Sequence, residues 1–470
     1  MKTICIAVKN AKLIQRYLLR SGLPFILAGR ENVRVILLAP EYEADIYRDE
    51  FQHEKILVLG MPLIPPAGLV RIADICFRFL VDDRFFIRYA RYKHARGLLS
   101  LPQLFIKIVF IYFFSLFPGL LWFADRCFKY AASFQKAPDF LTALFDTYHP
   151  DVVFATSLAE SKFDVPILLE ARRRGIPTAG TARGWSSIGA GAHYLIDPDV
   201  WLVQDQFMKE MAHNTQYAPE NRIRVTGFPY FDWFTKNEFI IPRESFLHSL
   251  GIDPQMRVIL YAGSGEGIVE REIGFARIFE ELVRGGKIPS DAVLLFRPHP
   301  YQATVLLQST VFQKETWKHV FLDYAEVHNI KRPDDYVHDR ESLIHLMNSF
   351  MHSEMVVTPG STLFIEAAAF KKPLVALAFD SDQSVPYWLS FARRYDGSHL
   401  EYKELLRSGG IKKVSSKDEF ARAINDYLED PSRDAEGSKI LYERFVAPCD
   451  GKATYRLANE LLTLVSQKKI

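Results

Sequence analysis

The sequence has little of what marks several large classes of protein. Its 470 residues include only four cysteines, which are far apart and form no CxxC pair or Cys/His cluster: Cys5, Cys76, Cys127 and Cys449. This spacing excludes a structural zinc site and indicates a reducing, cytoplasmic compartment. A formal net charge of +2 argues against a general nucleic-acid-binding protein. No internal repeat or low-complexity tract is present.

The sequence also lacks an apolar run long enough to cross a bilayer as one helix. The opening stretch MKTICIAVKN is too short for a signal peptide and predicts a first strand. The longest run, residues 108–124, has seventeen uncharged residues against the ~20 of a spanning helix, and Pro118 and Gly119 interrupt it.

Residues 108–124 have three interpretations. They form a buried helix pair of the first domain, a patch that lies in the membrane interface, or a true span. The aromatic residues of the run and the basic residues before it favour the interface over the span. These basic residues are Arg84, Arg88, Arg91, Lys93, Arg96 and Lys107.

What the sequence does contain is a repeated alternation of short apolar strands and helices. A chain of this length is too long for one core and predicts two domains of roughly 200 residues each. Thr3–Val8 and Val33–Leu38 predict parallel strands around a helix, which is the opening of a doubly wound sheet. Gly227–Asp232 predicts a hinge, and Arg257–Ala262 predicts the first strand of the second domain.

The stretch Met355–Leu377 is the most informative of the chain. It predicts a buried strand, a Pro-Gly turn, a helix and a second strand, and a strand–turn–helix of this kind presents free amides to a phosphate. Ser361 and Thr362 can cap the helix and offer hydroxyls to the anion. Glu366 lies in an otherwise apolar helix, so we expect it either to bind ribose hydroxyls or to point to solvent.

Two further polar groups follow predicted strands of the second domain. The strand Ala292–Arg297 ends in RPHP, which puts Arg297 and His299 at the carboxyl edge of a sheet, where open α/β sheets bind ligands. Arg297 offers a fork for phosphate oxygens, and His299 can hydrogen-bond or protonate a leaving phosphate. The turn that begins with Gly263, Ser264 and Gly265 lets backbone amides approach a diphosphate.

The pattern RPHP, followed some sixty residues later by TPGSTLFIEAAAFKKP, resembles the carboxy-terminal half of GT-B-fold enzymes. The nearest families by pattern are the CDP-glycerol glycerophosphotransferases, the bacterial capsule and lipopolysaccharide glycosyltransferases, and the non-hydrolysing UDP-N-acetylglucosamine 2-epimerases. The segments VWLVQDQFMKEM, RIRVTGFPYFD and DGKATYRLANELL agree with that resemblance, which covers roughly residues 140–465.

The resemblance implies an α/β fold of the GT-B type. Two Rossmann-like, doubly wound domains would face a cleft, with residues 1–232 on the acceptor side and residues 233–450 binding the nucleotide donor. Residues 70–130 would be an apolar and basic insertion in the first domain, and residues 451–470 a terminal helix that crosses back to it.

The resemblance also implies a reaction. The protein would move a sugar or a polyol-phosphate from a nucleotide-activated donor to the hydroxyl of a glycan or lipid-linked acceptor, in bacterial surface polysaccharide synthesis. It would need no cofactor and no metal, because helix dipoles and basic side chains meet the diphosphate in this fold; the DxD-like Asp380-Ser381-Asp382 is then a polar loop. We expect a cytoplasmic enzyme, peripheral on the inner face of the cytoplasmic membrane if residues 108–124 bind it.

The residue that activates the acceptor stays open. Glu160, Asp164 and His193 are candidates because they fall in loops after predicted strands. Related enzymes carry a tryptophan motif, WHG or SWDN, near the interdomain cleft, and this chain has Gly184-Trp185-Ser186, without the histidine or the aspartate. The role of that polar residue is then either vacant here or taken by Arg183, Ser186 or Ser187. The loop with Arg183, Trp185 and Ser186 would line the acceptor side of the cleft, or it is a glycine-rich connector.

Two alternatives to a transferase remain. A nucleotide-sugar epimerase has the same fold but needs acid and base carboxylates on both faces of the sugar, and no membrane patch. A non-catalytic assembly partner would explain why the polar residues of the tryptophan motif are missing.

Overall fold

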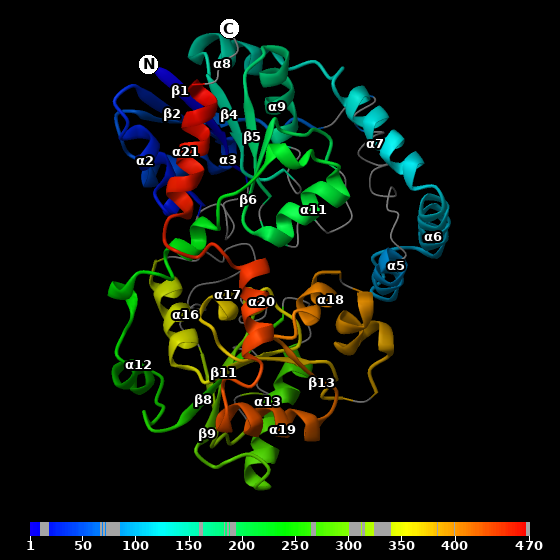
Figure 1. Ribbon diagram of the computed structural model, residues 1–470, viewed down its shortest axis with the longest axis vertical. Helices are drawn as coiled ribbons and strands as arrows, with labels where there is room; N and C mark the ends of the chain where they lie inside the picture. The colour runs from blue at the N-terminus through cyan, green and yellow to red at the C-terminus, as the bar shows by residue number, and fades with distance from the viewer. Residues whose placement is uncertain are drawn as a thin grey trace. The chain divides into compact units, whose positions relative to one another are not determined.

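The computed structural model describes residues 1–9, 18–65, 68, 71, 85–158, 163–182, 184–185, 188, 194–264, 269–299, 312, 315–323, 340–382, 384–398 and 400–466. The chain forms two compact units. The first unit contains Met1–Ile87, Leu101–Thr235 and Ala447–Ile470, and the second contains Arg88–Ser100 and Lys236–Val446. Each unit has one sheet with helices on it (Figure 1).

The sheet of the first unit is parallel and has the strand order β3-β2-β1-β4-β5-β6-β7. Its strands are almost entirely apolar and buried, as expected when helices cover both faces of a parallel sheet. The order reverses between β1 and β4, which makes their carboxyl ends a switch point of the fold. The strands are β1 Lys2–Ala7, β2 Val33–Pro40, β3 Ile56–Met61, β4 Val152–Ala155, β5 Thr178–Gly180, β6 Val200–Val203 and β7 Ile223–Val225.

The last helix, α21 (Ala453–Ser466), packs on the first unit, which confirms the predicted crossing-back (Figure 1). Its residues Leu457 and Leu461 are buried in the same core as the strands of the first sheet. Asp232 caps this helix: its carboxylate accepts hydrogen bonds from the backbone N–H groups of Ala453 at 2.9 Å and Thr454 at 2.8 Å. The predicted hinge segment therefore also anchors the end of the chain.

The other helices of the first unit cover the sheet or lie between its strands in sequence. They are α2 Leu23–Ala28, α3 Glu41–Glu50, α6 Leu101–Leu116, α7 Pro118–Ala132, α8 Asp139–Tyr148, α9 Asp164–Arg173, α11 Gln206–Gln216, and the short helices η1 Glu220–Arg222 and η2 Pro229–Asp232.

The sheet of the second unit is also parallel, with the order β10-β9-β8-β11-β12-β13. The two parallel sheets with their helices confirm the predicted α/β fold of two Rossmann-like units. The strands are β8 Arg257–Ala262, β9 Ala292–Arg297, β10 Val320–Leu322, β11 Met355–Thr358, β12 Leu374–Leu377 and β13 Lys412–Val414. The helices are η3 Asn237–Phe239, α12 Arg243–Ser249, α13 Val269–Arg284, α16 Arg340–His352, α17 Leu363–Ala369, η5 Tyr387–Leu389, η6 Arg394–Ser398, α18 Leu400–Arg407, α19 Lys417–Glu429 and α20 Ala435–Phe445.

One segment that the sequence assigned to the first domain belongs to the second unit. Residues Arg88–Ser100, which include most of helix α5 (Phe85–Ala95), belong to that unit. The guanidinium carbon of Arg393 lies 3.4 Å from the ring centroid of Tyr92, and that of Arg91 lies 5.7 Å from the ring centroid of Trp388. Cation–π contacts of this kind attach the segment to the second unit.

Residues 108–124 form parts of α6 and α7, which meet near Phe117. Ile111 and Leu121 are buried, but most of the large apolar side chains of the pair are exposed, so the interpretation as a buried core pair is wrong. Among the described helices, none alone is long and apolar enough to cross a membrane; α6 and Gly119–Ala132 pass that test only together, as a pair bent by 112°.

Candidate donor-phosphate site

Four loops of the second unit meet at the carboxyl edge of its sheet. They follow the neighbouring strands β9, β8, β11 and β12 and hold His299, Gly263, Gly360 and Arg394. The contacts between them are close: a Cβ atom on Gly263 would lie 2.6 Å from the backbone nitrogen of His299, and one on Gly360 would lie 2.5 Å from Arg394 Nη1. Gly360 also has φ = +128°, a backbone conformation that favours glycine. A side chain at this position would therefore both strain the backbone and collide with Arg394.

The turn after β8 is fixed by a carboxylate that the sequence did not predict. Glu272 of α13 is 2% exposed and accepts hydrogen bonds from the backbone N–H of Ser264 at 3.1 and 3.2 Å and from its hydroxyl at 2.8 Å. Burial raises the pKa of Glu272 to about 7, although the hydrogen bonds from Ser264 and the charge of Arg394 act in the opposite direction.

His299 is half-buried at the end of β9. Burial and the positive charge of Arg394 lower the pKa of His299 to about 4. The imidazole is therefore neutral at pH 7, with one nitrogen that donates a hydrogen bond and one that accepts. In the protein without ligand, His299 is a hydrogen-bonding group and not a cation.

Arg297, the last residue of β9, forms a buried ion pair beside the site. Its Nη1 lies 2.8 Å from Oδ2 of the buried Asp323, whose other oxygen lies 2.6 Å from His345 Nε2. Burial acts to raise the pKa of Asp323, but the charges of Arg297 and His345 hold it well below its usual range. Arg297 thus supports the loop that carries His299, and its contact with phosphate stays a prediction.

The turn after β11 has the predicted strand–turn–helix form with one difference at the cap. The hydroxyl of the buried Ser361 accepts a hydrogen bond from Leu363 N at 3.3 Å. Thr362 occupies the N-cap position but has helical backbone angles (φ −61°, ψ −18°) and makes no capping bond, so the prediction that it caps the helix is wrong. A capping side chain needs an extended backbone. Thr362 is exposed and Glu366 is half-buried.

Arg394 is the principal site residue that the sequence analysis missed. It is 2% exposed, and its Nη1 donates hydrogen bonds to the carbonyl oxygens of Pro359 at 3.2 Å and Gly360 at 2.6 Å. Its positive charge acts on both His299 and Glu272. The signal in the sequence was the pair Arg393-Arg394 inside the apolar stretch LSFARRY, because buried arginines need a specific partner.

The DxD-like segment after β12 is engaged in structural contacts. Asp380 forms an ion pair with Arg271 and accepts a hydrogen bond from the Ser390 hydroxyl. Asp382 accepts from the backbone N–H of Ser384 at 2.8 Å. Within the described residues, no group of three or more His, Cys, Asp and Glu side chains is arranged to hold a metal ion.

In the first unit, one catalytic candidate lies at the carboxyl edge of β4. Asp164 begins α9 and is 1% exposed. Its Oδ2 accepts a hydrogen bond from Ser157 N at 3.2 Å, and its buried Oδ1 has no hydrogen-bond partner in the described part of the chain. Burial raises the pKa of Asp164 to about 7, against the Ser157 hydrogen bond and the charge of Lys9, which lower it.

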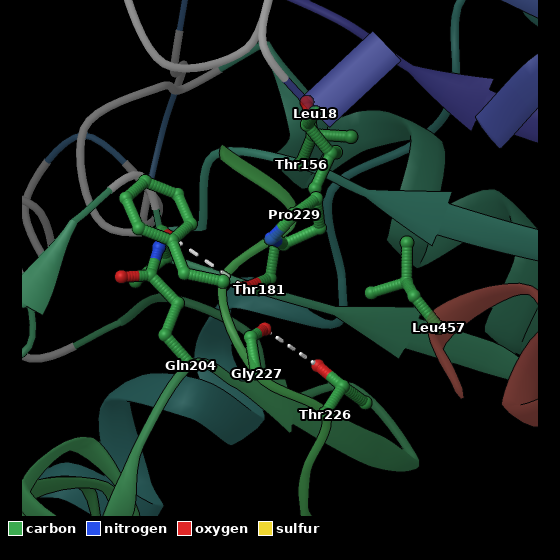
Figure 2. A pocket seen from close by; sticks show the side chains of 10 residues that line it. Leu18, Thr156, Thr181, Gln204, Thr226, Gly227, Pro229 and Leu457 are labelled. Carbon is green, nitrogen blue, oxygen red and sulfur yellow. Dashed lines mark hydrogen bonds between the residues drawn. The ribbon is translucent and has the colours of Figure 1, made fainter. Parts of the chain in front are cut away.

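A small cavity lies at the carboxyl ends of β4, β5, β6 and β7 (Figure 2). Thr156, Thr181, Gln204 and Thr226 line it, and its volume of about 10 Å³ holds about one water molecule. The Thr156 hydroxyl donates to Ala7 O at 2.9 Å, and the Thr226 hydroxyl to Gly227 O at 3.2 Å. The cavity is too small for a substrate, and its hydroxyls stabilise the strand ends.

The remaining predicted residues separate into two groups. Trp185 is buried, with its ring centroid 6.1 Å from that of Phe207, so its ring is part of the packing of the first unit. The others lie outside the described residues: Glu160, Arg183, Ser186, Ser187, His193 and Gly265.

Comparison with known proteins bears on this site. The sequence profile described as "CDP-Glycerol:Poly(glycerophosphate) glycerophosphotransferase" matches residues 193–463. A teichoic acid glycerol-phosphate transferase of Staphylococcus aureus is 21% identical over 338 residues, which are 69% of this chain and 74% of that one.

Solved structures resemble this one in fold. UDP-GlcNAc 2-epimerase of Neisseria meningitidis, bound to UDP-GlcNAc, has a TM-score of 0.51 and 13% identity over 98% of this chain and 100% of that one. A glycosyltransferase of Rickettsia africae has a TM-score of 0.50 and 11% identity over 98% of both chains. These matches confirm the predicted GT-B fold.

Proposed function

Because the chain belongs to the CDP-glycerol:poly(glycerophosphate) glycerophosphotransferase family, we propose that it transfers glycerol phosphate from CDP-glycerol to a hydroxyl of a growing cell-surface polymer. Membership of this family confirms the reaction class expected from the sequence, transfer of a group from a nucleotide-activated donor in cell-surface polymer synthesis. The UDP-GlcNAc 2-epimerase of Neisseria meningitidis shares the fold at 13% identity, and a likeness at this level does not indicate that this chain catalyses epimerisation.

The convergence of four loops on one edge of the second sheet is the observation that carries the proposal. A diphosphate bound there would meet the Gly263–Ser264 turn, the neutral imidazole of His299, the hydroxyl of Ser361 and the guanidinium of Arg394. Arg297 and Thr362 border the same loops, and Glu366 one helical turn further would bind the ribose. One fixed cation and several neutral donors suit a diphosphate diester.

The proposed reaction is a displacement at phosphorus. The acceptor oxygen attacks the phosphorus that bears glycerol, and the bond between that phosphorus and the bridging oxygen breaks, so that CMP leaves with the bridging oxygen. Asp164 is the proposed base for the acceptor hydroxyl, since its buried Oδ1 has no hydrogen-bond partner among the described residues. Arg394 and His299 stabilise the charge that develops on the leaving CMP. No metal is needed in this scheme.

The direct test is a thermal-shift measurement with CDP-glycerol, UDP-GlcNAc and other nucleotide-activated donors. A ligand at a hundred times its dissociation constant adds ~2.7 kcal/mol to the free energy of unfolding, so a clear shift is expected with CDP-glycerol. EDTA is expected to leave both the shift and the transfer rate unchanged. A shift with UDP-GlcNAc alone would contradict the donor assignment and favour a sugar-nucleotide enzyme.

Replacing Arg394 by alanine is expected to weaken CDP-glycerol binding by about 30-fold, because a charge-assisted contact contributes ~1.5–3 kcal/mol. Titration calorimetry measures it. Arg407→Ala is the control, since Arg407 is exposed and pairs with Glu404. Arg394→Ala also removes the hydrogen bonds to the carbonyl oxygens of Pro359 and Gly360. Thermal unfolding without ligand measures the stability lost with these bonds and so separates it from the loss of affinity. Binding by Arg394→Ala as tight as in the parent would remove Arg394 from the site.

We further propose that the protein is peripheral on a membrane and binds it through the exposed apolar face of α6 and α7. Phe105 is 68%, Phe123 58% and Trp122 48% exposed. The other exposed large apolar side chains of the pair are Leu101, Ile106, Val109, Phe110, Tyr112, Phe113, Leu116, Phe117, Leu120 and Tyr130. So many exposed large apolar side chains on two consecutive helices are unusual on a protein that stays in water.

Helix α7 is anchored to the rest of the first unit through its buried face. Lys129, which is 9% exposed, lies 3.0 Å from Asp125 and 2.8 Å from Asp197 in a partly buried ion-pair network. The exposed Arg126 donates to Tyr217 O at 3.3 Å and its guanidinium lies 5.8 Å from the ring centroid of Trp122. A fixed inner face and an apolar outer face with basic and aromatic residues are the features of an interfacial helix pair.

A further inference from the structure

Glu272 is a buried carboxylate beside the turn proposed to hold the donor diphosphate. Besides the hydrogen bonds from Ser264, its Oε2 lies 3.4 Å from the donating hydroxyl of Tyr261 on β8. A Cβ atom on Gly263 would lie 2.8 Å from Oε2. One side chain of α13 therefore holds the end of β8 and the two residues after it in one arrangement.

The groups that face Glu272 come from several elements. Tyr261 and Ser264 donate hydrogen bonds from β8 and its loop, and Arg394 is the nearby cation from the loop after β12. The same Arg394 charge acts on His299 and on Tyr395. Because its pKa is about 7, Glu272 carries a proton in about half of the molecules at neutral pH.

Building on the proposed function, we propose that Glu272 is a positioning residue that fixes the Gly263–Ser264 turn and gains a proton when a diphosphate diester binds. A new negative charge beside the turn disfavours the charged carboxylate, so the bound state holds the proton more tightly than the free state. By linkage, affinity falls as the pH rises above about 7, by up to about tenfold per pH unit.

Titration calorimetry of CDP-glycerol with the full chain tests the inference, because the diester itself does not ionise between pH 6 and 8.5. Runs at pH 7.5 in two buffers of different ionisation enthalpy give the number of protons taken up. The parent is expected to take up about half to three-quarters of a proton, because about a quarter of the free molecules already carry it at pH 7.5, and Glu272→Gln, which keeps the acceptor oxygen but does not titrate, close to none. The control is Glu281→Gln, on the same helix with its side chain 65% exposed, which is expected to behave as the parent.

Two further variants keep the inference falsifiable if Glu272→Gln does not fold. Ser264→Ala removes the 2.8 Å hydrogen bond and is expected to move the midpoint of the affinity–pH curve up by about one pH unit. His299→Gln is expected to keep the proton uptake. If His299→Gln abolishes the uptake, or if Glu272→Gln keeps it, the inference is wrong while the proposed function stands. If the parent binds no CDP-glycerol at all, the proposed function itself is wrong.

Discussion

Replacing Asp164 by asparagine is expected to lower the turnover number about 1,000-fold while CDP-glycerol binds as before. General base catalysis by a positioned side chain contributes ~10²–10⁴-fold, and asparagine has the shape of aspartate but cannot take the proton. The parent should gain activity as the pH rises to about 7, where Asp164 loses its proton, and then reach a plateau. Asp164→Asn should lack this rise. Initial rates between pH 5.5 and 9 measure both effects.

The stability of the same variant separates a catalytic role from a structural one. The pKa of Asp164 is raised in the folded state, so between about pH 4 and 7 the unfolded chain has lost a proton that the folded chain still holds. The stability contribution of this group therefore falls as the pH rises through that window, by about 4 kcal/mol in the limit of full burial. Asparagine removes this penalty, so the free energy of unfolding at pH 8 should stay equal or increase.

Glu170→Gln is the matched control on the same helix. Glu170 is 5% exposed and its Oε1 lies 2.6 Å from Arg174 Nε, whose guanidinium also pairs with Asp146 of α8. This variant is expected to lose stability and keep its turnover number, the reverse of Asp164→Asn. A stability loss in Asp164→Asn together with an unchanged pH profile of its rate would show that Asp164 is structural.

The fold could be read from the sequence because its strands are short apolar runs that end at glycine or polar residues. Met355–Thr358 and Ala292–Arg297 are buried strands, as predicted, and the loops after them meet at one edge. That inference needed only the rule that parallel strands end together. The register of the strands and the identity of their neighbours did not have to be known.

What the sequence did not reveal depends on contacts between distant segments. In the sequence, Glu272 looks like any exposed acidic residue of an amphipathic helix. In the structure it lies on the buried side of α13 and accepts a hydrogen bond from Ser264. Arg394 enters the site from the loop after β12, and Arg91 and Tyr92 lie in a segment that crosses to the second unit. Buried charges such as Glu272 and Arg394 can be recognised only when their partners are known, and both bear on the proposed donor site.

Replacing Phe113 and Trp122 together by aspartate is expected to lower the partition of the protein onto anionic phospholipid vesicles by at least about 100-fold. Each aromatic side chain contributes ~1.5–3 kcal/mol when it leaves water, and each new carboxylate is repelled by the lipid surface. Both side chains are exposed, at 44% and 48%, so the variant should fold as the parent does. Flotation of the protein with vesicles measures the partition.

The control for this variant adds the same charge elsewhere. Ile440 on α20 and Tyr455 on α21 are also large and exposed, at 45% and 56%, but belong to no apolar surface of this extent. Ile440→Asp with Tyr455→Asp should float with vesicles as the parent does, because its two new carboxylates lie away from α6 and α7; if the added net charge alone were responsible, both variants would float less than the parent. If the parent does not float, or if the Phe113 and Trp122 variant floats equally well, α6 and α7 do not bind lipid. Their exposed apolar face would then have to be covered by another protein.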